Sequence, residues 1–245
     1  MADIVKRIGV WVCLVTFGIL LAGCSSSKIQ NLSPEEIISR SNDRMKGLKG
    51  FEYLIQRTGA LVFFDYEETI AFSRAEGQYV SPDRVFAKVR VIMPGLVTEV
   101  NIISIGGIQW ETNLLTGKWQ STDPLYSFNP SILFNANNGI QFILANDVVN
   151  PVLVGLEGLP EIPGRKSYSI EATMPGDHAY DITFGMIDKD LLRVTLWVDT
   201  KTFDLNRIIV IDPANPGDDE DTTWQIDFWN FDTTFDIQEP VITDK

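Results

Sequence analysis

Residues 84–105 read RVFAKVRVIMPGLVTEVNIISI, and this stretch decides the fold. Apolar residues recur at about every second position of 84–92 and of 96–105, a period typical of strands with one buried face. Pro94-Gly95 between them suits a tight reversal. Because neighbouring strands joined by a short turn pair antiparallel, this stretch predicts a β-hairpin.

Further strand candidates surround the hairpin at short spacing. Phe51, Tyr53 and Ile55 alternate with polar neighbours, which predicts a half-buried strand. The other candidates up to residue 120 are 69–74, 78–80, 109–112 and 118–120. The turns between these strands contain Gly77, Pro82, Gly106-Gly107 and Gly117. Residues 51–120 are therefore predicted to form an antiparallel meander.

A capped helix is predicted in front of this meander. Ser33 is a good N-cap, Pro34 suits the first helical position, and Glu36 completes a capping box. Gly47 and Gly50 end the helix. Its apolar face consists of Ile37, Ile38, Ser41, Met45 and Leu48. This face must pack on another part of the protein.

The pattern changes over residues 124–150, where Pro and Asn interrupt two apolar stretches. A second helix is predicted over 139–149. Strand candidates then resume at 153–157, 166–172, 179–184, 192–199 and 205–211, and 223–229 and 235–237 form a final pair. Because no fixed repeat or clear linker is present, we predict a single α+β domain with one large curled antiparallel sheet packed over a few helices.

A curled sheet under a partial helical lid can enclose an apolar hollow. The alternation leaves open whether side chains fill this hollow or a ligand enters it. Aromatic residues on the predicted strands either pack the core or line the hollow, and these are Phe51, Tyr53, Phe72, Trp110, Trp119, Trp197, Trp224 and Trp229. Candidates for its mouth come from the irregular helical segment, the part most able to move aside: Ile132, Leu133, Phe134, Ile140, Phe142, Ile143 and Leu144. Sheet residues that point inward would form the floor.

The N-terminus has the layout of a secretory signal. Lys6 and Arg7 precede an uncharged run over residues 8–20, which is shorter than the roughly 20 apolar residues that span a bilayer. Leu21-Ala22-Gly23-Cys24 follows and resembles the lipobox of bacterial lipoproteins. We therefore expect a signal peptide over 1–23, lipid on Cys24, a tether over 24–32 and one domain over 33–245. The alternative is a plain secretory signal or a short N-terminal anchor.

Charge and cysteine count exclude several classes of protein. Removing residues 1–23 takes away Asp3, Lys6 and Arg7 and leaves 18 Lys and Arg against 32 Asp and Glu, a net charge of −14. Such a chain would repel nucleic acid and anionic lipid headgroups, so lipid on Cys24 has to supply the membrane attachment. Cys13 leaves with the signal, so the mature chain has no partner for a disulfide.

Candidate chemistry is sparse. The lone His178 lies in a Gly/Pro turn, where a surface role is expected, and no Gly-x-Ser-x-Gly nucleophile motif occurs. The chain also has too few Cys and His residues to ligate zinc. From these three observations together we predict no enzyme, no cofactor and no catalytic or metal-binding residue. The acidic run 212–221 (DPANPGDDED) remains open between a solvated hairpin loop and a Ca²⁺ ligand.

Several local patterns occur together in order along the chain. They are MKGLKGF (45–51), AEG (75–77) before Pro82, EV (99–100) leading to GG (106–107), TGKW (116–119), WVD (197–199) followed by LNR (205–207), and FDIQEP (235–240). In this order and spacing the chain resembles the LppX/LprG (LppX_LprAFG) family of mycobacterial lipoproteins and, more distantly, the LolA/LolB-like periplasmic lipoprotein carriers. The acidic residues 218–221 depart from the family pattern.

The resemblance implies a half-barrel antiparallel sheet over helices with an apolar cavity between them. It implies that the cavity binds acyl chains of a lipid or glycolipid, and that the protein assists lipid transfer or export across the cell envelope, with a membrane transporter as a further partner. The expected location is the extracytoplasmic face of the cell membrane, or the outer membrane if the cell is diderm. The alternative from another class is a surface lipoprotein that binds a protein partner in a structural or regulatory role.

Overall fold

The structure is a computed structural model that describes residues 32–242 apart from residues 126, 189, 215 and 218. The predicted signal peptide, Cys24 and the tether up to residue 31 lie outside the described residues. The chain from Ser33 onward forms one unit, and every element below belongs to it. Among the described residues, no helix is both long enough and apolar enough to cross a bilayer.

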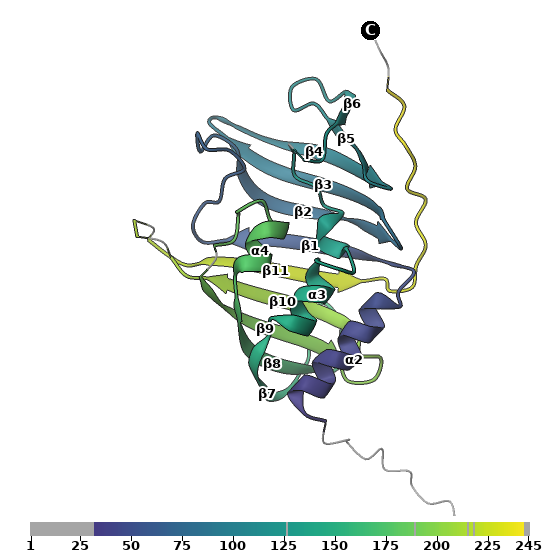
Figure 1. Cartoon of the computed structure of the whole chain (residues 1–245), viewed down its shortest axis with the longest axis vertical. Coiled ribbons are helices and arrows are strands. Elements are labelled where there is room, and N and C mark those ends of the chain that lie inside the picture. Colours follow the sequence, from purple (N-terminus) through teal and green to yellow (C-terminus); the bar gives the residue numbers. More distant parts are fainter. Residues whose placement is uncertain (1–31, 126, 189, 215, 218, 243–245) are drawn as a thin grey trace, which may run out of the picture. The chain divides into compact units, whose positions relative to one another are not determined.

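One antiparallel sheet of eleven strands forms the frame of this unit (Figure 1). The strands lie in the order β6-β5-β4-β3-β2-β1-β11-β10-β9-β8-β7, so β6 and β7 are the edges and the sheet is not closed. The first six are β1 (Gly50–Thr58), β2 (Ala71–Val80), β3 (Arg84–Met93), β4 (Leu96–Ile105), β5 (Ile108–Thr112) and β6 (Trp119–Thr122). The others are β7 (Val149–Glu157), β8 (Ser167–Pro175), β9 (Leu191–Asp199), β10 (Leu205–Asp212) and β11 (Thr222–Trp229).

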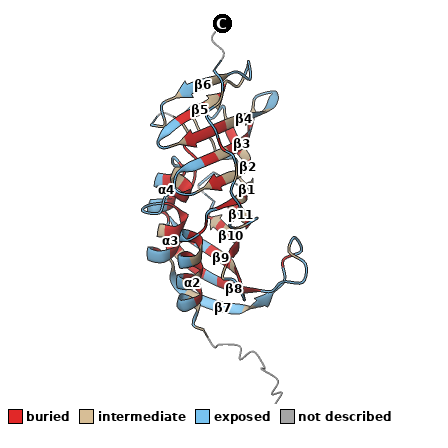
Figure 2. Cartoon of the chain, turned by 90° about the vertical axis from the view of Figure 1, so that its right-hand side faces the viewer, coloured by how far each residue is buried: buried red, intermediate tan, exposed pale blue. Residues whose placement is uncertain are grey.

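The helices of the described residues all lie over one face of the sheet, which we call the inner face (Figures 1 and 2). They are α2 (Pro34–Lys46), the 3₁₀ helix η1 (Ile132–Phe134), α3 (Ile140–Asn146) and α4 (Asp177–Ile182). The predicted fold class, a single antiparallel sheet packed against a few helices, is confirmed. The hairpin over 84–105 is also confirmed, since β3 and β4 pair from Arg84↔Ile105 to Met93↔Leu96.

An aromatic cluster packs the centre of the inner face. Phe51 and Tyr53 of β1 are fully buried, and their ring centroids lie 5.2 Å and 4.7 Å from that of Phe134 on η1. Phe228 of β11 and Tyr79 of β2 lie 5.4 Å and 4.9 Å from Phe51. Offset and edge-on ring pairs of this kind add about 0.5–1.5 kcal/mol each beyond the area they bury. The cluster therefore fixes η1 over the middle of the sheet.

The N-terminal helix follows its sequence prediction closely. The Ser33 hydroxyl accepts a hydrogen bond from the Glu36 amide, and the Glu36 carboxylate forms an ion pair with Arg40. The five predicted apolar-face residues are all buried, and Asn42 is buried with them. Gly47 ends the helix in a right-handed conformation.

Two arginines clamp this helix and a neighbouring loop to the turn between β9 and β10. Arg44 of α2 pairs with Asp204 at 2.8 Å, and Arg165 pairs with Asp199 at 2.8 Å. Burial raises the pKa of Asp199, but hydrogen bonds from Arg165 and from the amides of Thr202 and Lys201 outweigh it, so the net pKa is lowered.

Four predicted elements differ in the structure. The predicted break at Gly77 is wrong, because Gly77 lies inside the continuous strand β2. A Cβ at Gly77 would come 1.9 Å from the carbonyl oxygen of Phe86 and 2.8 Å from the Tyr53 hydroxyl. The glycine is therefore needed for close approach, since Tyr53 passes over it to donate a hydrogen bond to Phe86 O at 3.2 Å.

The predicted strand over 179–184 is wrong and is replaced by α4. Ala179 and Ile182 are buried three residues apart, which is a helical spacing. In so short a segment a period of two and a period of 3.6 cannot be told apart. The predicted helix over 139–149 is shorter than expected, because Val149 begins β7.

The predicted final strand over 235–237 is also wrong. This segment lies outside the strands and packs on the outer face of the sheet, where Phe235 and Ile237 contact a cluster with Trp110. Arg84 Nη1 donates a hydrogen bond to Ile237 O at 2.9 Å. The C-terminal segment thus covers one apolar cluster of the outer face, which also contains Val80, Phe86, Ile103, Ile105 and Trp119.

We predict that Gly77→Ala destabilises the protein by about 3 kcal/mol, because a methyl group at this position must displace backbone. Gly155→Ala in β7 is the matched control, since a Cβ there meets nothing within 4 Å, and it should stay within about 0.5 kcal/mol of the parent. Urea unfolding of both variants measures the difference. Equal stability of the two variants would contradict the close approach at Gly77.

We predict that Asp199→Asn costs about 2 kcal/mol at pH 7, since it removes a charged acceptor from Arg165. Because folding lowers the pKa of Asp199, its stabilisation is present above the unfolded value of about 3.9 and is lost as the pH falls through the lowered value. The gap between wild type and variant should therefore shrink below about pH 4. Urea titrations at pH 7 and pH 3 check this, with Asp43→Asn on the exposed side of α2 as control. A gap that is constant across this range would refute it.

Candidate functional site

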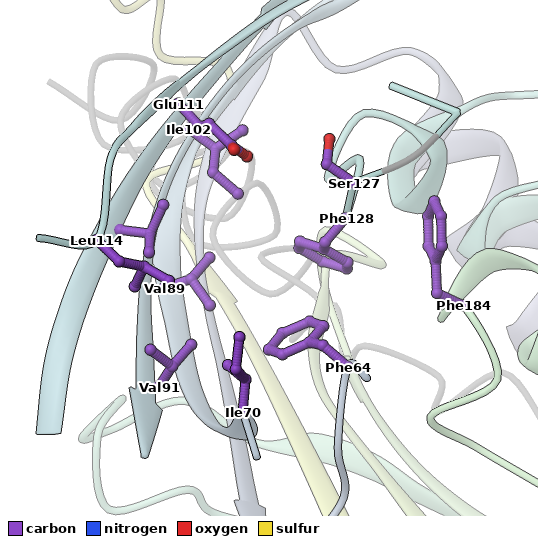
Figure 3. Close-up of a pocket in the computed structure, with 11 residues that line it drawn as sticks. Phe64, Ile70, Val89, Val91, Ile102, Glu111, Leu114, Ser127, Phe128 and Phe184 are labelled. Atoms are coloured by element: carbon purple, nitrogen blue, oxygen red, sulfur yellow. The ribbon is translucent and has the colours of Figure 1, made fainter. Parts of the chain in front are cut away.

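An apolar pocket of about 240 Å³ lies on the inner face beside β3, β4 and β5 (Figure 3). Its floor is formed by the buried side chains of Val89, Val91 and Ile102. The register Val89↔Val100 places Val100 on the same face, and it also lines the pocket. The alternating residues of the hairpin that decides the fold therefore also build this floor.

Three phenylalanines from separate loops form the opposite wall, as Figure 3 shows. The centroid of Phe128 lies 5.8 Å from that of Phe64 and 6.4 Å from that of Phe184. Phe184 is 42% exposed, so this ring marks the rim of the pocket. Its backbone has a positive φ of 56°. We call Phe64, Phe128 and Phe184 the aromatic rim.

The loop that carries Phe64 is closed by its own hydrogen bonds. The Phe64 amide donates to Ile70 O at 2.9 Å, and the Asp65 carboxylate accepts from the Ile70 amide at 2.8 Å. A hydrogen bond from the Thr69 hydroxyl, with those from the Ile70 and Thr69 amides, outweighs burial and lowers the pKa of Asp65. The rim position of Phe64 is thus fixed by a compact local turn.

One end of the pocket is polar. Glu111 of β5 and Ser127 both line it and lie at the same end in Figure 3. Gln109, which is fully buried, donates to Ser127 Oγ at 2.8 Å and to Phe128 O at 3.0 Å, so it positions both the polar end and the aromatic rim. The pocket can therefore accept an apolar chain with a polar end group, and the carboxylate of Glu111 disfavours an anionic one.

The strand aromatics predicted to line the cavity lie elsewhere. Phe51 and Tyr53 belong to the central cluster, and burial raises the pKa of the Tyr53 phenol. Phe72 is buried behind the rim, with its ring 5.9 Å from that of Phe64. None of the three lines the 240 Å³ pocket, and their contact with a ligand stays a prediction.

The helical-segment residues divide into two groups. Leu133, Ile140, Ile143 and Leu144 line a second, wholly apolar hollow of about 60 Å³ above β9, β10 and β11. The others lie away from both hollows: Phe134 in the central cluster, and Ile132 and Phe142 half-buried. Their predicted role as a mouth also stays a prediction.

Residues 182–184 contribute to both hollows. Ile182 and Thr183 line the smaller one, and the next residue, Phe184, lines the larger. The helix α4 that carries this segment is held by a contact of 2.7 Å between His178 Nδ1 and Asp147 Oδ2. The lone histidine therefore joins α4 to the end of α3.

The acidic segment has partners within the chain. Asp221 pairs with Arg193 at 2.7 Å and accepts from the Ala214 amide at 3.0 Å. Burial raises the pKa of Asp212, and the nearby Asp188, Asp190 and Asp221 add to the effect. Across the described residues, no group of three or more His, Cys, Asp or Glu side chains is arranged to hold a metal ion.

The pocket residues differ in how visible they are in sequence. Val89, Val91, Val100 and Ile102 belong to the inward positions of predicted strands, as expected for a floor. The aromatic rim, Leu114 and Ser127 come from loops, where no periodicity marks them. Glu111 lies at an inward position of β5, and a charge there is the one local signal for the polar end.

Comparison with known proteins gives a family and a fold. The family described as LppX_LprAFG lipoprotein matches residues 33–237. The crystal structure of LprF from Mycobacterium bovis is similar with a TM-score of 0.64 and 15% identity, over 84% of this chain and 96% of that one. LppX from Mycobacterium tuberculosis gives a TM-score of 0.58 and 17% identity, over 84% of this chain and 98% of that one.

More distant likenesses are weaker. A LolA superfamily protein from Nitrosomonas europaea gives a TM-score of 0.30 and 12% identity, over 82% of this chain and 93% of that one, which is too low to support an argument. Among curated protein sequences, none matches this chain significantly.

We predict that Glu111→Gln strengthens binding of dodecanoate about fivefold, because one repulsive charge near the polar end is worth about 1 kcal/mol. Dodecanol, with the same chain and a neutral end, should change by less than about twofold. Glu99→Gln on the outer face of β4 removes the same charge and serves as control. Fluorescence displacement titrations measure both ligands, and an equal effect on both would rule out a selective polar end.

Proposed function

Because this chain belongs to the LppX_LprAFG lipoprotein family, we propose that it binds acyl chains of a lipid or glycolipid in the inner-face pocket and assists their transfer or export across the envelope. The observation that carries the proposal is the pocket with an apolar floor, an aromatic rim and one polar end. This arrangement matches an amphiphile, which has an apolar chain and a polar head.

The pocket would replace the bilayer as the solvent of the chain. Burial of apolar surface contributes about 25 cal/mol per Å², so a chain of several carbons gains a useful binding energy from the floor alone. Flat aromatic rings add contact area at little entropic cost, because each ring has only two torsions to fix. The polar end sets the direction in which the chain enters.

A whole glycolipid needs more room than the pocket provides. A volume of about 240 Å³ is below the range of about 300–1,000 Å³ usual for pockets that enclose drug-sized ligands. Ile182 and Thr183 line the hollow of about 60 Å³, and the next residue, Phe184, lines the pocket. We propose that a larger ligand displaces this segment and joins the two hollows. Helix α3, which belongs to the segment that the sequence predicts to move aside, would then act as a movable cover together with residues 182–184.

Attachment to the membrane is part of the same proposal. We propose that the signal peptide 1–23 is removed and that Cys24 carries the lipid, with the domain on the extracytoplasmic face. The lipoprotein family supports an envelope-associated, lipid-anchored protein. Two or three acyl chains at about 0.8 kcal/mol per buried CH₂ anchor a protein stably, so the anchor offsets the repulsion that a charge of −14 creates.

Native mass spectrometry tests the proposal. The mature protein is incubated with envelope lipid extract, and we expect retention of an acylated ligand. Val100→Trp should abolish retention, because the indole fills the pocket. Val97→Trp is the matched control on the same strand, since Val97 is 50% exposed and pairs with Ile92 on the outer face.

Two results would argue against lipid binding. Failure of the parent protein to retain any acylated ligand favours the rival function, a surface lipoprotein that binds a protein partner. Retention by Val100→Trp equal to that of Val97→Trp would place the ligand outside the inner-face pocket. Circular dichroism of both variants confirms that they remain folded.

A further inference from the structure

The edge strand β7 carries an unusual number of exposed apolar side chains. Val152 and Val154 are 60% and 53% exposed. Val149, Leu153 and Leu156 are also exposed. The strand contains a single charge, Glu157 at its end. The other edge, β6, is a four-residue strand of sequence WQST, in which Trp119 is the one large apolar side chain. We call it the β7 edge.

The backbone of β7 is poorly suited to pair with another strand. Pro151 has no amide hydrogen to donate, and Asn150 has a positive φ of 52°. The pairing of β7 with β8 is irregular between Val149 and Val152 and again between Leu153 and Gly155. Prolines and bulges are the features by which natural edge strands avoid extension. A partner of this edge must therefore be apolar without offering a strand.

The β7 edge lies on the side of the domain where the chain to Cys24 begins. Helix α2 contacts β7, and Figures 1 and 2 both show the start of α2 beside that strand. The nine residues 24–32 can extend by no more than about 30 Å. A lipid on Cys24 would therefore keep the start of α2, and the β7 strand that α2 contacts, within reach of the bilayer surface.

We propose that the β7 edge rests on the surface of the lipid bilayer and orients the domain there. The proposal depends on the lipid anchor of the proposed function. Apolar side chains on both faces of an edge strand can enter the boundary between headgroups and acyl chains, and a bilayer needs no strand to pair with. The near absence of charge in β7 removes the electrostatic obstacle that the rest of this acidic domain presents.

This orientation turns the ligand pocket away from the anchoring membrane. The floor strand β4 lies eight strand spacings from β7, or about 38 Å along the sheet at 4.8 Å per spacing. A pocket held at that distance faces a partner across the envelope and not the bilayer to which Cys24 is attached. The β7 edge would thus set the direction in which the ligand is presented.

Single-cysteine labelling tests the orientation. The mature chain has no free thiol once Cys24 carries lipid, so an introduced cysteine is labelled alone. The lipidated full chain is reconstituted in phosphatidylcholine vesicles with an environment-sensitive fluorophore at Val154→Cys. Leu115→Cys, an exposed apolar position in the turn before β6, is the matched control. A spin-labelled lipid in the acyl region acts as quencher.

We expect the label at residue 154 to shift to shorter wavelength and to lose more than half of its emission to the quencher, while the label at residue 115 stays unchanged. Equal exposure of both labels to water would overturn the proposal. Excimer formation by pyrene at residue 154 would also overturn it, because it would show a second copy on the β7 edge. Flotation of the vesicles distinguishes failure of the orientation from failure of the lipid anchor. Protein that floats without quenching at residue 154 refutes the orientation alone. Protein that does not float refutes the anchor as well.

Discussion

The packing of β1 against η1 divides the inner face of the sheet into two unequal halves. Phe51 and Tyr53 lie under Phe134, and their burial fixes η1 at the centre, where β1 and β11 meet. On one side of this cluster α2, α3 and α4 cover the strands β8–β11 and leave only a small hollow. On the other side, β3–β5 are faced by loops, which contribute the aromatic rim, Leu114 and Ser127. The inner-face pocket lies there, over apolar strand residues on which no helix of the described residues packs.

The sheet has three distinct surfaces, which are its inner face, its outer face and the β7 edge. The inner face provides the core and the pocket. The cluster around Ile103 and Trp110 on the outer face is covered by the chain's own C-terminal segment, through Phe235 and Ile237. The β7 edge stays exposed and apolar beside the helix that leads to the tether. The acidic composition disfavours contact of the remaining surface with anionic headgroups, and we propose the lipid anchor and the β7 edge as the means of attachment.

The sequence predicted the sheet well because its signal is local. Alternation over 84–105, 205–211 and 223–229 marks strands whose one face is buried, and Ser33 with its apolar stripe marks α2. The failures have physical causes. Gly77 resembles a turn residue, yet it is required by the approach of Tyr53 to Phe86, which lies 33 residues further along the chain. The segment 179–184 is too short for its period to be recognised. For the site, the valine floor followed from the alternation, whereas the aromatic rim could not be predicted, because Phe64, Phe128 and Phe184 meet only through tertiary folding of three loops.

In the proposed function, an acyl chain occupies the inner-face pocket between the valine floor and the aromatic rim. A fatty acid with a photoreactive group near the end of its chain tests this most directly, because cross-linked peptides identified by mass spectrometry report where the chain lies. We expect cross-links to peptides that contain Val91, Ile102 or Phe128. If the segment at 182–184 moves aside, we also expect cross-links to the peptide over residues 140–144. Cross-links confined to β7, to the C-terminal segment or to the outer face of β3 and β4 would contradict it.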